Sequence, residues 1–407
     1  METQKVKILM GPSESMDKSF QDGCLEFLRK LGETLGNEIV CADMSEVKSQ
    51  KLPLYFIASG GAESGFVSVY EQTAEPYILL TTQEHNSLAA AMEIMGYLQE
   101  HGLRGEIIHG SFEEMAERLN VLLRVSAAKE KISRMRLGCL GTPDGLVASD
   151  VDFEAFHNSC GAEMVMIDMQ EILEEYENVG YPENEYTEAL KRKADSQNFD
   201  RSEIEKALAV YGALKRIVER YRLDAVTVKC FDLLHKVHMT GCLALAILNA
   251  EGIPAACEGD QKSLVSMTLL HALTGQSGFM ANPNRLDPVS GEILFAHCTL
   301  PLDLSDSYEI MTHFESGIGV AFTCDLAPQP MTVFKCNGSL SRYYAGRAEL
   351  VETTHKSGLC RAQMRLHMKE GMEYFLRRPI GNHHIICKGD WKGVIDEYFI
   401  STLGKNI

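Results

Sequence analysis

Glu258 and Asp260 stand on either side of Gly259, where the short apolar run 254–257 meets a helical stretch expected over 263–273. Carboxylates at the end of such a run can bind a cation or move a proton. Carboxylates near a helix start also commonly stabilise the helix dipole, so the spacing alone leaves both interpretations open. From its position directly after the apolar run, we predict that Glu258 is both a metal ligand and a proton-transfer base.

Two adjacent histidines, His383 and His384, precede the apolar run 385–387. Adjacent side chains on a strand point to opposite faces, so at most one of the two can bind a given metal directly. We predict that His383 is the ligand and that His384 turns to the opposite face or to a contact behind the site. The alternative is one exposed histidine and one that is buried and hydrogen-bonded, with no metal. His297, at the end of the run 293–296, has the same ambiguity.

Several common catalytic and nucleotide-binding patterns are missing from the sequence. It contains no Gly-x-Ser-x-Gly elbow, no Gly-x-Gly-x-x-Gly fingerprint and no P-loop, and its twelve cysteines include no Cys-x-x-Cys pair. What remains is a set of Glu, His and one further oxygen ligand. Such hard oxygen and nitrogen donors suit Mn²⁺ or Mg²⁺ better than the thiolate-rich sites that select zinc.

The composition excludes two classes of partner. The 407 residues include 39 Lys plus Arg and 57 Asp plus Glu, which gives a net charge of −18. Such a surface repels phosphate backbones and anionic lipid, so we expect neither nucleic acid nor membrane as a partner. The longest apolar stretches, such as 243–248, are far below the ~20 residues that span a bilayer. Because the first residues also lack an apolar signal-peptide run, we expect a cytoplasmic protein with reduced thiols.

The order of apolar runs predicts the fold class. Continuous apolar runs alternate with helical patterns as far as about residue 254, which is typical of parallel sheets covered on both faces. After residue 255, short apolar runs separated by Gly, Pro, Asn and Asp indicate a mainly β region. We therefore predict an N-terminal α/β domain (1–135), a second α/β domain (136–254) and a β-rich C-terminal domain (255–407) that carries the metal site.

Two local features refine the second domain. The segment 180–200 is polar and rich in Glu, Asn and Lys, which predicts a solvated connection. Ser202 and Glu205 have the spacing of a capping box, which predicts a helix from residue 202 to residue 221.

The order and spacing of several segments resemble the L-fucose isomerase and L-arabinose isomerase superfamily, in its shorter fucose-isomerase-like branch. The similarity extends over nearly the whole chain, and no single motif is diagnostic. The segments are Gly60-Gly61-Ala62-Glu63, Asn86 to Glu93, Gly138 to Ser149, Val228 to Phe231, Ala256 to Asp260, Gly278 to Asn282, His297-Cys298 and Gly381 to His384.

The resemblance implies two α/β domains followed by a β-rich domain, a homo-oligomer with sites near subunit junctions, and a divalent metal, usually Mn²⁺. In that family a Glu, an Asp and a His bind the metal, and the two carboxylates move protons between C1 and C2 of an open-chain aldose through an enediol. Glu258 matches the Glu and His383 matches the His. Asn282 stands where the family has its Asp, and we include it as a metal ligand.

Four further residues complete the predicted site as substrate contacts. Lys229 and His297 lie at the ends of apolar runs that would feed the pocket, so we expect them to contact substrate hydroxyls or the enediolate. A surface lysine that merely closes a strand is the alternative for Lys229. Asp260 and His384 are included as substrate-binding residues because they adjoin the predicted ligands.

The amide of Asn282, in place of the family's carboxylate, affects which function we expect. An amide oxygen can coordinate Mn²⁺, but at neutral pH it cannot accept a proton as a carboxylate does. Losing a negative charge also lets the pocket tolerate an anionic substrate better, and Arg285 could add to this effect.

We therefore predict a metal-dependent aldose–ketose isomerase acting on a sugar that carries phosphate, sulfonate or carboxylate. One alternative is a sugar-binding or regulatory homologue that has lost turnover, and another is a metal-dependent lyase or epimerase on the same scaffold.

Overall fold

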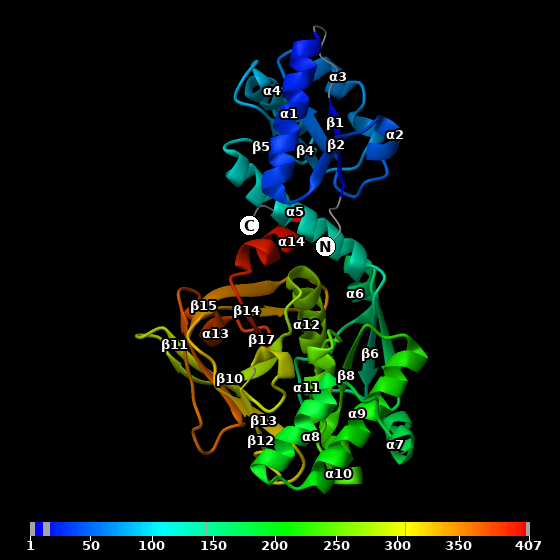
Figure 1. Cartoon of the computed structure of the whole chain (residues 1–407), viewed down its shortest axis with the longest axis vertical. Helices are drawn as coiled ribbons and strands as arrows, with labels where there is room; N and C mark the ends of the chain where they lie inside the picture. Colours follow the sequence, from blue (N-terminus) through cyan, green and yellow to red (C-terminus); the bar gives the residue numbers. More distant parts are fainter. Residues whose placement is uncertain (1–4, 11–16, 144, 179, 306, 404–407) are drawn as a thin grey trace. The chain divides into compact units, whose positions relative to one another are not determined.

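The computed structural model describes residues 5–10, 17–143, 145–178, 180–305 and 307–403 (Figure 1). The chain divides into two compact units, Met1–Ala127 and Ala128–Ile407. The three-domain division, with boundaries after residues 135 and 254, stays a prediction. Within the described residues, every helix is too short or too polar to cross a membrane.

The first unit is built on a parallel sheet with the strand order β2-β1-β3-β4-β5. Its strands are β1 (Lys5–Met10), β2 (Glu38–Cys41), β3 (Leu54–Ile57), β4 (Tyr77–Thr81) and β5 (Gly105–Ile108). The helices are α1 (Lys18–Leu35), α2 (Met44–Val47), α3 (Glu63–Val67), α4 (Ser87–Glu100) and α5 (Phe112–Ile132), of which α5 runs past the unit boundary. β3 and β4 are buried throughout because their two faces pack into separate apolar clusters, one around Leu31 and Phe56 and the other around Tyr55 and Ile94.

The second unit begins with a parallel sheet of strand order β7-β6-β8-β9. Its strands are β6 (Arg136–Leu140), β7 (Glu163–Ile167), β8 (Ala225–Val228) and β9 (Ala255–Ala256). The helices are α6 (Phe153–Cys160), α7 (Met169–Glu177), α8 (Glu185–Gln197), α9 (Arg201–Tyr221), α10 (Cys230–Val237), α11 (Cys242–Ala250) and α12 (Gln261–Thr274). Nearly all side chains of α11 and α12 are buried, so both helices are core elements.

Two local predictions in this unit were wrong. The segment 180–200, predicted as a solvated connection, contains helix α8, whose Thr187, Leu190 and Ala194 are buried. Asn184 is the N-cap of that helix and forms a capping box with Thr187. Leu190 lies on the apolar face of the helix and is buried. The capping box expected at residue 202 is also absent, since α9 starts one residue earlier and Asp200 is its N-cap.

The remainder of the second unit is a closed antiparallel barrel with the strand order β10-β11-β16-β15-β14-β17. The strands are β10 (Phe279–Asp287), β11 (Glu292–His297), β14 (Pro330–Cys336), β15 (Tyr343–Thr353), β16 (Ala362–Met368) and β17 (His384–Lys388). A two-stranded sheet, β12 (Tyr308–Met311) and β13 (Ala321–Cys324), and helices α13 (Met372–Arg377) and α14 (Lys392–Leu403) complete the unit. The predicted fold class, two parallel α/β sheets followed by a β-rich part, is confirmed.

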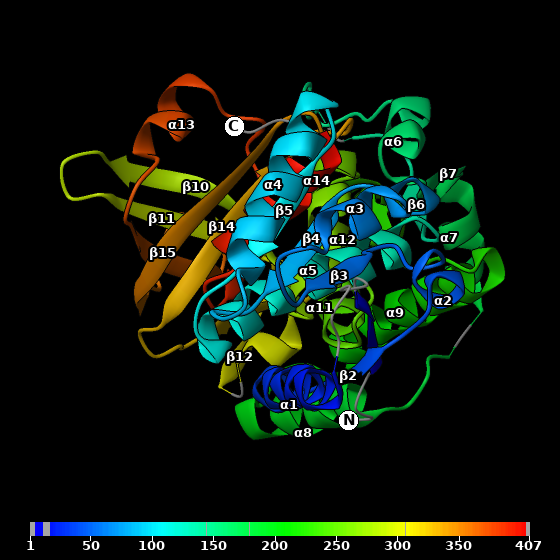
Figure 2. The same cartoon turned by 90° about the horizontal axis from the view of Figure 1, so that it is seen from above.

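Helix α12 joins the second parallel sheet to the barrel. It contacts β8 and β9 on one side and β14 and β17 on the other. Both views place it between the barrel strands and β6 (Figures 1 and 2). The carboxyl ends of β8 and β9 therefore lead directly toward the barrel.

The barrel register brings distant residues to one end. β10 lies between β17 and β11, where Ala281 pairs with His384 and Asn282 pairs with Ala296. His383 and His297 are each one residue beyond those pairs, so they flank Asn282 from two neighbouring strands.

Candidate active site

The turn between β9 and α12 presents the Glu258 carboxylate. Glu258 has φ +59° and Gly259 has φ +63°, both in the left-handed region. Glycine is required at 259, because a Cβ there would lie 2.6 Å from the carbonyl oxygen of Thr142. A non-glycine residue in this conformation costs about 1 kcal/mol or more, and such residues are found at active sites as well as at helix ends.

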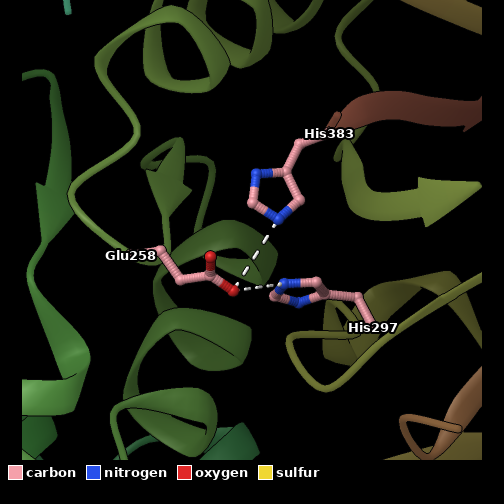
Figure 3. A group of neighbouring side chains, drawn as sticks. All are labelled: Glu258, His297 and His383. Carbon is pink, nitrogen blue, oxygen red and sulfur yellow. Dashed lines mark hydrogen bonds and ion pairs between the residues drawn. The ribbon is translucent and has the colours of Figure 1, made fainter. Parts of the chain in front are cut away.

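Glu258, His297 and His383 form one cluster, in which one donor atom from each residue lies within 4.8 Å of the others (Figure 3). Glu258 Oε1 is 3.3 Å from His297 Nε2 and 3.7 Å from His383 Nε2. Both histidines are buried, and Glu258 is largely buried. Three residues from a sheet end, β11 and the start of β17 thus converge on one point.

His383 leaves one buried nitrogen without a partner. Its Nδ1–H donates to Asp260 Oδ2 at 2.9 Å, which leaves the lone pair on Nε2. Among the described residues, Nε2 has no hydrogen-bond partner, although it faces the Glu258 carboxylate. Two electron-pair donors that face each other in a buried site are stabilised by a cation between them. The donor set of one carboxylate and two imidazoles therefore fits a divalent metal ion.

The pKa shifts of Glu258 and His383 agree with this arrangement. Burial lowers the pKa of His383, which keeps the ring neutral. Burial would raise the pKa of Glu258, but the His297 hydrogen bond and the nearby histidines hold it below its ordinary value. Burial would lower the pKa of His297, but its hydrogen bond with Glu258 raises it, so a metal ion at Nε2 would have to displace the proton that His297 shares with Glu258. Glu258 is thus the anionic group of the cluster.

Behind His383, Asp260 and Lys335 form a buried ion pair. Asp260 caps α12 through Ser263 N, and its Oδ2 lies 3.6 Å from Lys335 Nζ. Lys335 Nζ also donates to Ser263 Oγ at 2.8 Å. Burial alone would raise the pKa of Asp260, but Lys335 and the His383 hydrogen bond hold it far below its ordinary value.

Asp260 was predicted as a substrate contact, but its side chain has no exposed surface, since it faces His383 instead. Its geometry is that of a residue that orients the histidine.

Two other predicted residues make contacts outside the cluster of Glu258, His297 and His383. Lys229 precedes α10, and its Nζ lies 3.5 Å from Asp232 Oδ1. His384 points away from Glu258 into an aromatic group. Its Nδ1–H donates to the Asn382 carbonyl at 2.9 Å, and its Nε2 is 3.0 Å from the Tyr374 hydroxyl. The substrate contacts of Lys229 and His384 stay predictions.

A cavity of about 210 Å³ opens beside Glu258 and His297. Asn282 also lines it, and the Asn282 Oδ1 accepts a hydrogen bond from Asn382 Nδ2 at 3.0 Å. The remaining lining residues are Cys230, Phe231, Leu234, Thr240, Gly241, Cys242, Cys257, Cys298, His313, Glu315 and Cys360. The cavity is thus polar around the cluster and rich in thiols elsewhere.

This chain is distantly homologous to sugar isomerases. It is 23% identical over 221 residues to a sulfoquinovose isomerase from Alkalicoccus urumqiensis, a match that covers 52% of this chain and 49% of that protein. It is 26% identical over 223 residues to a sulfoquinovose isomerase from Clostridium sp. (strain MSTE9), with the same coverage. The match thus spans about half the length of these curated relatives. No family model matches the chain.

Two features of this region were not predicted. His297 was expected to contact substrate, and its Nε2 also lies in the group that could hold a metal ion. Lys335 was not singled out at all, although a lysine within the apolar strand Pro330–Cys336 is an unusual residue and could have drawn attention.

The two adjacent histidines allow a matched test of the metal site. We expect His383→Asn to weaken Mn²⁺ binding by more than about 10-fold, since it removes a proposed ligand. The same change at His384 is expected to have a smaller effect, because that ring faces Tyr374. Titration calorimetry with MnCl₂ measures both, and a larger loss at His384 would mean that the two roles must be exchanged.

Proposed function

We propose that this protein is a metal-dependent aldose–ketose isomerase that acts on an open-chain acidic sugar such as sulfoquinovose. The observation that carries the proposal is the buried cluster of Glu258, His297 and His383, with its unpartnered nitrogen, beside a cavity. The distant homology to sulfoquinovose isomerases supports the reaction class and the acidic substrate. We also expect a homo-oligomer, from the resemblance to the fucose isomerase superfamily.

Mn²⁺ is the proposed metal, with Mg²⁺ as the other hard cation that the donors suit. Glu258, His297 and His383 would hold it, and the Asn282 amide oxygen would be a further ligand. That oxygen already accepts one hydrogen bond but has a second lone pair. When bound, a divalent ion would polarise the C1 carbonyl and the C2 oxygen of the sugar.

Glu258 is the proposed base. Its carboxylate would take the proton from C2 and return it to C1, while the hydroxyl proton on O2 passes to O1. Its pKa is held below the ordinary value, so the Glu258 carboxylate carries no proton at neutral pH, although the same shift makes it a weaker base. Asn282 cannot act as a second base, since an amide does not accept a proton at neutral pH.

The amide at Asn282 is the proposed reason for an acidic substrate, because an aspartate there would add a negative charge to the cavity. We expect Asn282→Asp to lower the kcat/KM ratio of acidic to neutral aldose by about tenfold, which corresponds to ~1.4 kcal/mol of added repulsion. Asn282→Ser, which adds no charge, is the control and should keep the preference. Equal ratios in the Asp variant and the parent protein would show that the amide does not set specificity.

A catalytically weakened sugar-binding protein is the second candidate, and Asn282 is again the observation that favours it. To distinguish the two, metal-stripped protein is incubated with sulfoquinovose, with and without added Mn²⁺, and ¹³C NMR follows formation of the ketose. Conversion that depends on Mn²⁺ supports the isomerase. Binding of the sugar without conversion in either sample supports the alternative.

A further inference from the structure

Two cysteines in the wall of the cavity lie within reach of a disulfide bond. Cys230 Sγ and Cys257 Sγ are 2.8 Å apart, and both thiols are free. Cys230 is the first residue of α10 after β8, and Cys257 directly follows β9, the neighbouring strand. A disulfide bond is about 2.05 Å long, so the two sulfur atoms need to approach by less than an ångström.

The two thiols differ in access. Both line the cavity beside Glu258, but Cys257 is buried, whereas Cys230 is half-buried. An oxidant that enters the cavity would therefore meet Cys230 first, and Cys257 is placed to resolve the product.

We propose that Cys230 and Cys257 are a reversible redox site that controls metal binding at Glu258. With hydrogen peroxide as the oxidant, the Cys230 sulfur attacks one peroxide oxygen, breaks the O–O bond and becomes a sulfenic acid as water is released. The Cys257 sulfur then attacks the Cys230 sulfur, forms the S–S bond and expels a second water. Two thiols are thus oxidised to one disulfide while one peroxide is reduced to two waters, and an added dithiol reverses the change.

Cys257 is directly connected to the proposed metal ligand Glu258. Cys257 is joined to Glu258 by one peptide bond, and Glu258 already holds a left-handed conformation with φ +59°. A disulfide would bring the two sulfur atoms closer by less than an ångström, and we expect part of that movement to fall on Cys257. This consequence rests on the proposed metal site, and we expect Mn²⁺ affinity to fall by about tenfold in the oxidised form.

The same cavity holds a second group of thiols that could compete. Cys298 and Cys360 both line it, and Cys242 packs against Cys298. The test must therefore identify which sulfurs are joined. The full chain is treated with hydrogen peroxide, and disulfide-linked peptides are mapped by mass spectrometry without reductant. Calorimetry measures Mn²⁺ binding before oxidation, after oxidation and after treatment with dithiothreitol.

After oxidation we expect the chain to be lighter by two hydrogen atoms and a disulfide-linked peptide to join Cys230 to Cys257. Mn²⁺ binding should be weaker in this form. Dithiothreitol should break the link and restore the Mn²⁺ affinity. Cys230→Ser should abolish the link, whereas the matched variant Cys360→Ser should keep it. A Cys298–Cys360 link in place of the expected one, or equal Mn²⁺ affinity in the two redox forms, would overturn the proposal. If the link forms but neither form binds Mn²⁺, the proposed function fails and control of metal binding fails with it, while the disulfide assignment stands.

Discussion

Replacing Glu258 by glutamine is expected to lower kcat/KM at least ~100-fold, the scale of general-base catalysis, while the fold is kept. The amide has nearly the same shape as the carboxylate, so the β9–α12 turn and its contact with His297 can persist. It cannot accept the C2 proton, and it contributes no negative charge to the cluster. Steady-state kinetics with Mn²⁺ and sulfoquinovose measure the loss, and circular dichroism checks the fold.

Glu315 supplies the matched control for this experiment. It lines the same cavity but lies outside the cluster of Glu258 and the two histidines. Glu315→Gln should therefore keep most of the activity. A Glu258→Gln variant as active as the Glu315→Gln variant would remove Glu258 from the role of base.

Lys335→Met is expected to lower the free energy of unfolding by about 3 kcal/mol, the cost of leaving a buried charge without its partner. Asp260 would keep its carboxylate in a fully buried position with only Ser263 and His383 to stabilise it. Because Asp260 also orients His383, Mn²⁺ binding should weaken in the same variant. Urea denaturation without added metal measures the first effect, and calorimetry measures the second.

Two comparisons make the Lys335 experiment specific. Adding Asp260→Asn to Lys335→Met removes the orphaned charge and should recover part of the lost stability. Lys369→Met breaks an ion pair of 3.0 Å with Glu349 on the barrel surface and should cost less than about 1 kcal/mol. Equal losses of unfolding free energy for Lys335→Met and Lys369→Met would mean that the buried ion pair stabilises the fold no more than the surface pair does.

The parallel sheets could be predicted from the sequence because their central strands are continuous runs of apolar residues. Leu54–Ile57 is apolar throughout and Tyr77–Thr81 is apolar as far as Leu80, as expected of strands buried on both faces. The strand Phe279–Asp287 was not predicted, since Pro283 and two asparagines interrupt its pattern. The structure accommodates that proline beside an irregular step in the pairing with β11. The helix Glu185–Gln197 was missed because its apolar face is narrow and most of its residues are polar.

The site was only partly predictable, because its parts depend on pairings between distant strands. Glu258 and His383 could be chosen from local patterns and family resemblance. His297 joins them only because β10 pairs with β11 on one side and with β17 on the other. The burial of Asp260 against Lys335 likewise depends on how α12 packs on β14, which no local pattern contains.

The most direct test of the central claim follows the sugar proton itself. The Mn²⁺-loaded protein is incubated with sulfoquinovose in D₂O, and NMR records the signal of the hydrogen on C2. We predict conversion to the ketose together with solvent deuterium at C2 of the aldose, and neither in the Glu258→Gln variant. Sugar binding without conversion and without exchange at C2 would contradict the assignment of this protein as an isomerase.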